Sequence, residues 1–327
     1  MKIAFTSCAS TNLVPNQPVW DQILGQQPDH LVLLGDNFYN DVPDFSITQL
    51  QEMGTWEFAE HLFVRYQQQL SQAQFRNLVA APGIQIHAIW DDHDFAWNNA
   101  NGAEMLASPM QADKVLISTN FMREFRKALA AKDLGSFPST PYAGEFWVDS
   151  NPPNLKPLGA QSIPLENDGR SWLHLTDGRT FRRKPTMLGA AQRAQLDQAF
   201  NAQPGALHII ASGSTFSQTD GWHKYPTDRN WLAQAAGDQA WLMLSGDIHS
   251  NALLEHELSV NGRLVEATAS GAAIHAYLNK VIKGPEVQNY GLLDLQQDQL
   301  LISLLSFNHV VTQAIYARNI TGDLAVS

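Results

Sequence analysis

Short apolar runs recur along the chain, and helical patterns separate many of them. Runs of four to seven largely apolar residues between polar segments are typical of buried strands. They occur at residues 2–7, 30–34, 84–90, 171–176, 207–211 and 241–244. Between them, amphipathic patterns predict helices at residues 19–27, 56–72, 114–132, 188–200 and 225–236. This alternation predicts an α/β fold with a wound sheet.

The last third of the chain favours antiparallel pairs. Residues 252–259 and 264–268 flank Asn261-Gly262, which is a strong hairpin signal. A second hairpin is predicted from residues 292–295 and 300–306. We find no internal repeat and no boundary of a second domain, so a single domain is expected over residues 1–327.

Residues 137–170 interrupt the regular pattern. Six of the 16 prolines lie in this stretch, and no periodicity persists there. It is interpreted as an irregular Pro-rich excursion, with a hairpin near 145–148. Long segments of this kind serve as lids or binding loops, and a surface loop without a role is the alternative.

Composition limits the classes of function. The 327 residues are 44% hydrophobic, with a formal net charge of −11, which argues against a nucleic-acid-binding surface. The single cysteine excludes an internal disulfide, and no apolar stretch is long enough for a membrane span. We expect a cytoplasmic protein, or a periplasmic or secreted one if an export signal has been removed. The oligomeric state is left open.

The apolar runs end in residues that can bind metal. Gly35-Asp36 follows one run, and Tyr39 lies three residues further on, so its phenolate can return to the same ion. A carboxylate at the end of a buried strand is costly without a cation. The alternative is a turn in which Asp36 caps a helix.

A denser cluster follows the third run. Asp91, Asp92 and Asp94 surround His93, and such carboxylates repel one another unless cations or protons intervene. A solvated acidic turn is the alternative, but the aromatic residues that flank the cluster argue against it. Asn99 follows closely and offers an oxygen for a metal or a contact for phosphate.

Two further positions complete the pattern. Asp247 and His249 project to the same side of an extended segment, because side chains alternate with period two. Cys8 follows the first run, where a small buried hydrophobic residue is the alternative interpretation. Ligands at the carboxyl ends of several strands predict one polynuclear metal site. Sites of this kind commonly catalyse the hydrolysis of phosphate esters. A phosphate-binding P-loop and a nucleophile elbow are both missing from the sequence.

Taken together, these motifs resemble those of PhoD-type alkaline phosphatases and phosphodiesterases, in the calcineurin-like metallophosphoesterase superfamily. The matching pieces are Ser7-Cys8, Gly35-Asp36-x-x-Tyr39, Trp90-Asp91-Asp92-His93-Asp94, Ser245-Gly246-Asp247-x-His249, and the longer segments 177–192 and 220–226. The resemblance implies a two-sheet mixed β sandwich flanked by helices. Around Ser212 and Ser214 the chain departs from the family, which places a polar residue facing the metals there.

The resemblance also implies a ligand set. Cys8, Asp36, Tyr39 and His249 would hold one metal, with Asp36 bridging to a second metal held by Asp92 and Asp247. Family members are described with Fe³⁺ and Ca²⁺. The residue types agree, since thiolate and phenolate suit ferric iron. An all-oxygen set suits Ca²⁺, Mn²⁺ or Mg²⁺ better than Zn²⁺, which stays an alternative at the second position.

The expected activity is hydrolysis of small phosphodiesters, with monoesters as a further class, by a metal-bound hydroxide. His93 would sit beside the leaving oxygen, and Asn99, Arg179 and His223 are the candidate phosphate-binding residues. A non-catalytic scaffold of the same fold and a phospholipase D-like hydrolase are the alternatives.

Overall fold

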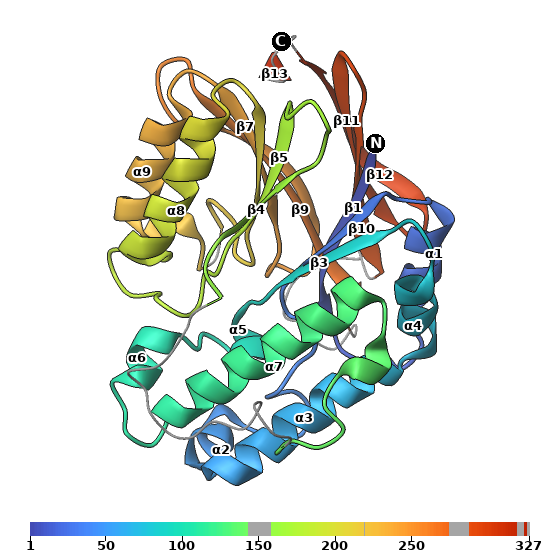
Figure 1. Ribbon diagram of the computed structural model, residues 1–327, viewed down its shortest axis with the longest axis vertical. Helices are drawn as coiled ribbons and strands as arrows, with labels where there is room; N and C mark the ends of the chain where they lie inside the picture. The colour runs from blue at the N-terminus through green and yellow to red at the C-terminus, as the bar shows by residue number, and fades with distance from the viewer. Residues whose placement is uncertain (143–157, 219, 275–287, 319–323, 326–327) are drawn as a thin grey trace.

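The computed structural model describes residues 1–142, 158–218, 220–274, 288–318 and 324–325. Within these residues, two mixed β sheets pack face to face, and helices cover the two outer faces (Figure 1). The fold class expected from the sequence is therefore confirmed.

Each sheet combines parallel and antiparallel strands. The first sheet has the order β13 (Leu324–Ala325), β12 (His309–Arg318), β11 (Gln299–Ser306), β10 (Asn289–Leu295), β1 (Lys2–Ala9), β2 (His30–Leu34) and β3 (Gln85–Ile89). The second sheet has the order β8 (Asn251–Glu257), β9 (Arg263–Ala273), β7 (Ala240–Ser245), β6 (Leu207–Ala211), β5 (Ser171–Leu175) and β4 (Gln161–Pro164). The sheets join where the end of β1 pairs with β9.

The hydrophobic core has three layers, and the central one lies between the sheets. It includes Phe5 and Val32 from the first sheet, and Leu207, Ile209 and Leu242 from the second. All five side chains are fully buried. Burial of this kind is the main favourable contribution to folding.

Helices enclose the other two layers. One layer lies between the first sheet and α1 (Val19–Gly25), α3 (Thr55–Ser71), α4 (Ala73–Ala80) and α7 (Ala112–Ala131). The other lies between the second sheet and α8 (Gly189–Ala202) and α9 (Pro226–Ala236). Both faces of the central strands are therefore covered, which explains why their sequences are continuously apolar.

Strand direction determines where the site can form. β1, β2 and β3 run parallel in the first sheet. β5, β6, β7 and β9 run parallel in the second, and β1 is parallel to β9 where the sheets join. The carboxyl ends of these strands consequently meet at one edge of the sandwich, which is the usual position for a binding site.

The sequence pattern identified most of these elements. The two hairpins predicted in the last third of the chain are confirmed, because β8 pairs antiparallel with β9 and β10 pairs antiparallel with β11. The pattern did not reveal β4, which lies inside the Pro-rich stretch, or β12, whose residues are largely exposed. It also missed the short helices α2 (Ile47–Glu52), α4, α5 (Asp92–Phe95) and α6 (Gly102–Leu106), which are too brief to show a clear period.

Two further expectations concern a hairpin near residues 145–148 and the absence of a membrane-spanning segment. The hairpin expected near 145–148 lies outside the described residues. Among the described helices, none combines the length and the apolar character needed to cross a membrane.

A buried histidine pair joins β5 to β6. His174 Nε2 and His208 Nδ1 are 2.9 Å apart, and both side chains are buried. Burial lowers the pKa of His174 to about 3 and that of His208 to about 4, and the proximity of His208 acts on His174 in the same direction. Both rings are therefore neutral in the folded protein at neutral pH.

We expect this pair to make the fold sensitive to acid. An unfolded histidine has a pKa of about 6.5, so below that pH the unfolded chain binds protons that the folded chain does not. The free energy of unfolding should fall as the pH drops from about 6.5 towards 4, by on the order of 1.4 kcal/mol per pH unit for each histidine. Urea unfolding at a series of pH values across this range measures the effect. The double variant His174→Gln/His208→Gln should show a shallower slope, and equal slopes would contradict the assignment.

Candidate metal centre

Cys8 lies at the joined edge of the two sheets, where the register between β1 and β9 shifts. The pairing of β1 with β9 shifts register between Ser7 and Ala9, and Cys8 itself has a φ of 61°. Between these pairing positions β9 has one residue more than β1, so the irregularity lies in β9, opposite Cys8. With this backbone conformation the Cys8 thiol points toward the Asp36 carboxylate, to which it donates a hydrogen bond.

The same backbone conformation recurs at other predicted site residues. Asp36, Asn99, Asp247 and His249 all have positive φ values, of 48°, 63°, 76° and 55°. A non-glycine residue in this region costs on the order of 1–3 kcal/mol and persists only when its surroundings enforce it. Backbone strain therefore coincides with the predicted site residues.

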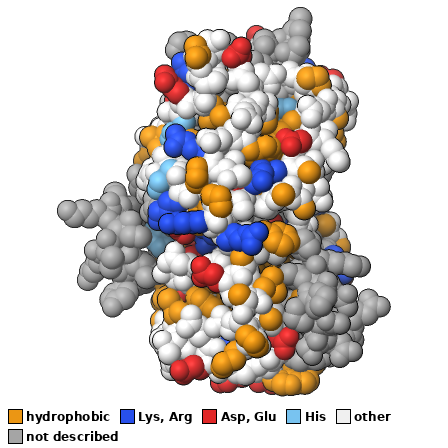
Figure 2. Space-filling model, turned by 90° about the vertical axis from the view of Figure 1, so that its left-hand side faces the viewer, with side chains coloured by type: hydrophobic (Ala, Val, Ile, Leu, Met, Phe, Trp, Pro, Cys, Tyr) orange, Lys and Arg blue, Asp and Glu red, His pale blue; other side chains and the backbone are white. Residues whose placement is uncertain are grey.

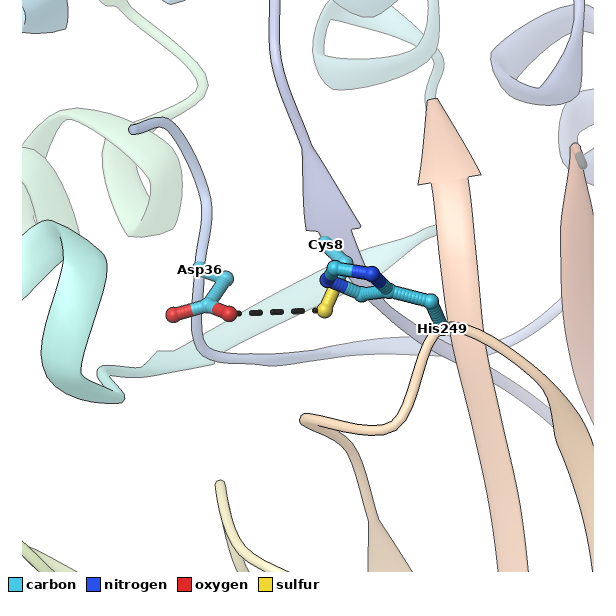
Figure 3. Close-up of side chains that lie close together, drawn as sticks. All are labelled: Cys8, Asp36 and His249. Atoms are coloured by element: carbon cyan, nitrogen blue, oxygen red, sulfur yellow. Dashed lines mark hydrogen bonds between the residues drawn. The ribbon is translucent and has the colours of Figure 1, made fainter. Parts of the chain in front are cut away.

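Cys8, Asp36 and His249 form one compact cluster. Their ligand atoms all lie within 4.8 Å of one another, and the Cys8 Sγ lies 3.4 Å from Asp36 Oδ2. Figure 3 shows the three side chains converging from the end of β1 and from the loops that follow β2 and β7. The Tyr39 hydroxyl completes the group, at 2.9 Å from His249 Nε2 and 3.3 Å from Asp36 Oδ2.

Two more clusters extend this one. Asp36, Asp92 and His93 form the second, and Asp91, Asp92 and Asp247 form the third, each again within 4.8 Å. Asp36 belongs to the first two clusters and Asp92 to the last two. The arrangement is thus a connected series of groups that could hold metal ions, in which two carboxylates, Asp36 and Asp92, are shared between adjacent clusters.

Burial makes the negative charge in this series costly. It raises the pKa of Asp36 well above its usual range, and the neighbouring Cys8 acts in the same direction. Burial also raises the pKa values of the Cys8 thiol and the Tyr39 phenol. Burial and the charge of His93 lower the pKa of His249 to about 4, so its imidazole is neutral, as a metal ligand requires.

The donor set fits metal ions. Asp91 Oδ2 and His249 Nδ1 are buried and have no hydrogen-bond partner among the described residues. A nearby cation favours the ionised forms of the carboxylate, thiol and phenol groups that burial disfavours. The first cluster offers sulfur, nitrogen and oxygen donors, whereas the third offers oxygen only. The residues present therefore fit two metal positions that differ in their donor atoms.

Arg179 neutralises part of the third cluster. Its Nε lies 2.6 Å from Asp91 Oδ1 and its Nη2 lies 3.6 Å from Asp92 Oδ1. Although burial opposes the shift, Arg179 and His93 lower the pKa of Asp92 to about 2. The Arg179 side chain is only 1% exposed, so it lies behind the carboxylates. Its expected contact with substrate phosphate stays a prediction.

Asp94, the last residue of the Asp91–Asp94 motif, has a structural role. Its Oδ2 accepts hydrogen bonds from the backbone and side chain of Asn37, and its Oδ1 accepts one from the Asp91 backbone. It therefore fixes the turn that starts α5 and leaves Asp91 and Asp92 to face the site.

Asp41 holds His93 in place. Asp41 Oδ1 and His93 Nδ1 are 2.6 Å apart, and the other Asp41 oxygen accepts a hydrogen bond from the backbone of Asn98. Burial lowers the pKa of His93, but the carboxylates of Asp36, Asp41 and Asp92 outweigh it and raise that pKa to about 10. With Nδ1 occupied by Asp41, Nε2 is the edge of the ring that can act on a ligand.

A cavity of about 550 Å³ opens over the clusters. It is lined by Asp92, His93, Asn98, Asn99, Gln218, Asp220, Lys224, Asp247, Ile248, His249 and Ser250. The structure thus brings Asn99 to the cavity together with several predicted ligands. His223 is exposed and is not among the lining residues.

Sequence reasoning missed three residues of this site, one of which, Lys224, lines the cavity. Asp91 belongs to the Asp-Asp-His-Asp motif, whose density pointed to it, but only Asp92 was assigned as a ligand. Asp41 had no comparable signal, since nothing in its local sequence shows that it pairs with a histidine 52 positions away.

Comparison with known proteins supports the fold. No family model matches the chain, and no curated protein matches it. A solved structure of PhoD is similar over 100% of this chain and 72% of its own, with 15% identity and a TM-score of 0.64. At this identity the similarity establishes the fold, which is that of the metallophosphoesterases.

Two more solved structures match with lower scores. An uncharacterized protein from Streptococcus pneumoniae TIGR4, described as a predicted phosphoesterase, has 9% identity and a TM-score of 0.32, covering 97% of each chain. A Vps29 single mutant from Entamoeba histolytica has 8% identity and a TM-score of 0.33, covering 98% of this chain and 100% of its own.

Close packing at Gly213 gives a test of the centre. A Cβ atom added there would lie 2.6 Å from Asp91 Oδ1, so Gly213→Ala must displace that carboxylate. We expect bound metal to fall about tenfold or more and the melting temperature to drop. Metal analysis after dialysis and thermal unfolding measure the two effects. Gly25→Ala is the control, because a Cβ there meets nothing within 4 Å; equal metal content in both variants would contradict the prediction.

Proposed function

We propose that the protein is a metal-dependent phosphoric ester hydrolase that acts on phosphodiesters and, as a further class, on monoesters. One observation carries the proposal: the connected series of metal-binding clusters opens into a cavity whose lining includes His93. The fold that the chain shares with the PhoD structure supports this class.

The residues suggest which metals bind. Cys8, Tyr39, Asp36 and His249 would hold ferric iron. The oxygen-only set around Asp92 would hold a hard ion such as Ca²⁺, with Mn²⁺ or Mg²⁺ as alternatives. When bound, such ions withdraw negative charge from phosphoryl oxygens and activate water.

His93 is the proposed proton donor. Asp41 fixes its Nδ1, so the Nε2 edge is available to protonate or hold the leaving oxygen. A cation bound to Asp36 and Asp92 would lower the pKa of His93 from the value that these carboxylates impose, which favours proton transfer at moderate pH.

The cavity suggests a preference for diesters. A diester carries one negative charge and two organic groups, and a cavity of about 550 Å³ has room for both. Asn99 and Lys224 line it and can donate hydrogen bonds to nonbridging oxygens. Arg179 and His223 remain predicted contacts, although Arg179 lies behind the carboxylates and His223 lies outside the lining.

Removing the shared carboxylate should abolish function. Asp36→Asn keeps the shape of the side chain, and asparagine tolerates the positive φ at this position. We expect at least about a thousandfold loss of bis(p-nitrophenyl) phosphate hydrolysis, because two of the three clusters lose the anionic ligand that they share. Metal content should fall in parallel. The exposed Asp238→Asn is the control for loss of one charge; full activity of Asp36→Asn would refute the assignment.

The variant Asp41→Asn should show whether Asp41 acts by positioning His93 rather than by binding metal. We expect kcat to fall about 10- to 100-fold while metal content is retained, because Asp41 acts through His93. The loss should be larger for an alkyl leaving group, which needs a proton, than for p-nitrophenolate. Comparing kcat for the two esters measures this difference. An equal loss for both would show that Asp41 has only a structural role.

A further inference from the structure

A second cavity, of about 540 Å³, lies outside the proposed catalytic site. Its lining comes from α6, from the start of α8 and from the segment between β5 and α8: Ala103, Leu106, Phe181, Arg183, Thr186, Gly189, Ala190, Ala191 and Arg193. None of these residues lines the catalytic cavity. A volume of this size is typical of sites that bind small molecules.

The surroundings of this cavity are basic, although the protein is acidic. Arg183 and Arg193 line the cavity and the adjacent Lys184 is exposed, whereas the whole chain has a net charge of −11. The lining contains no carboxylate. Figure 2 shows Lys and Arg side chains gathered across the middle of the face that includes α8 and α9. The cavity therefore favours a negatively charged ligand.

A tight turn fixes Arg183 at the cavity. The backbones of Arg183 and Thr186 bond to each other in both directions, at 2.8 and 2.6 Å. The buried Asp228 carboxylate holds the turn by accepting a hydrogen bond from the Thr186 hydroxyl, and Thr227 N donates to Pro185 O over 3.2 Å. The backbone beneath Arg183 is thus anchored to the first turn of α9.

Arg183 supplies the charge that a ligand can use. Its side chain is exposed, and it forms no ion pair with any residue that the structure describes. Arg193 lines the same cavity, but its charge is balanced by Asp228. One guanidinium therefore remains for the ligand, and a guanidinium binds a carboxylate through two parallel hydrogen bonds.

The rest of the lining is mostly apolar. Phe181, Leu106 and the alanines of α6 and α8 contribute hydrocarbon surface beside the guanidinium. A ligand with one negative charge and an apolar tail matches both parts. A dianionic phosphate monoester fits less well, because the lining offers no second unbalanced cation among the described residues.

We propose that this cavity binds a small amphipathic monoanion, a carboxylate with a short hydrocarbon tail. The carboxylate pairs with Arg183, and the tail lies against Phe181 and Leu106. This site is separate from the metal centre, so the inference does not depend on the proposed hydrolase activity.

Binding of octanoate tests the proposal. Isothermal titration calorimetry is carried out on the full-length protein with octanoate, with octanol as the uncharged counterpart and with acetate as the counterpart without a tail. We expect octanoate to bind at least about tenfold more tightly than either, because each counterpart lacks one of the two contributions. Equal affinity for octanoate and octanol, or for octanoate and acetate, would overturn the proposal.

Two variants locate the site. Arg183→Glu should weaken octanoate binding at least about tenfold, whereas Arg76→Glu, with the same change of charge on the exposed side of α4, should not. Ala190→Trp should also weaken it, because the exposed alanine lines the cavity and an indole would fill it. Unchanged binding in both cavity variants would overturn the assignment.

A third variant separates this site from the metal centre. Asp36→Asn protein, which should lose metal, is expected to bind octanoate as tightly as the wild type. Loss of octanoate binding in Asp36→Asn would show that the carboxylate occupies the metal centre instead, and the proposal would fail. If octanoate binds as expected but the wild-type protein hydrolyses no ester, only the proposed function fails.

Discussion

Burial of negative charge at one edge of the sandwich is the constraint on which the site depends. Asp36, Asp91 and Asp92 lie close together and almost without solvent, beside a buried thiol and phenol. Carboxylates in such surroundings require cations or protons, since neither water nor distance separates their charges. Arg179 supplies one positive charge from within the chain, and metal ions are the chemical class that fits the remaining donors.

The two sheets make this arrangement possible by holding strained backbone. Cys8, Asp36, Asp247 and His249 have positive φ values at or just after the ends of strands that are packed on both faces. Each such residue lowers stability locally, so the extensive apolar core between and outside the sheets must compensate. A rigid scaffold around a strained site keeps ligand atoms within a narrow range of distances, which metal binding requires.

One short segment, residues 179–183, contributes arginine side chains both to the metal centre and to the second cavity. Arg179 and Arg182 are buried and face inward, where Arg179 pairs with Asp91 and Arg182 donates to Ser214 over 2.6 Å. Arg183, the next residue, is exposed at the second cavity. The inward arginines offset carboxylates at the metal centre, whereas the outward one leaves positive charge at the surface of an acidic protein. Two adjacent residues, Arg182 and Arg183, therefore contribute positive charge to two different environments.

The pattern of apolar and polar residues was enough to predict an α/β fold and to predict which candidate site residues lie at one edge of it, whereas the two-sheet sandwich was implied by the family resemblance. Continuous apolar runs identify strands buried on both faces, and parallel strands carry their terminal residues to one edge. For this reason Cys8, Asp36, Asp92, Asp247 and His249 could be expected to lie together.

Other features of the site could not be read from the chain. The register shift opposite Cys8, the pairing of Asp41 with His93 and the burial of Arg179 behind Asp91 emerge only in the folded molecule. Local patterns encode the direction and burial of each element, whereas these contacts join segments that are far apart in the chain. They depend on how the two sheets and their loops pack, which no single stretch of sequence specifies.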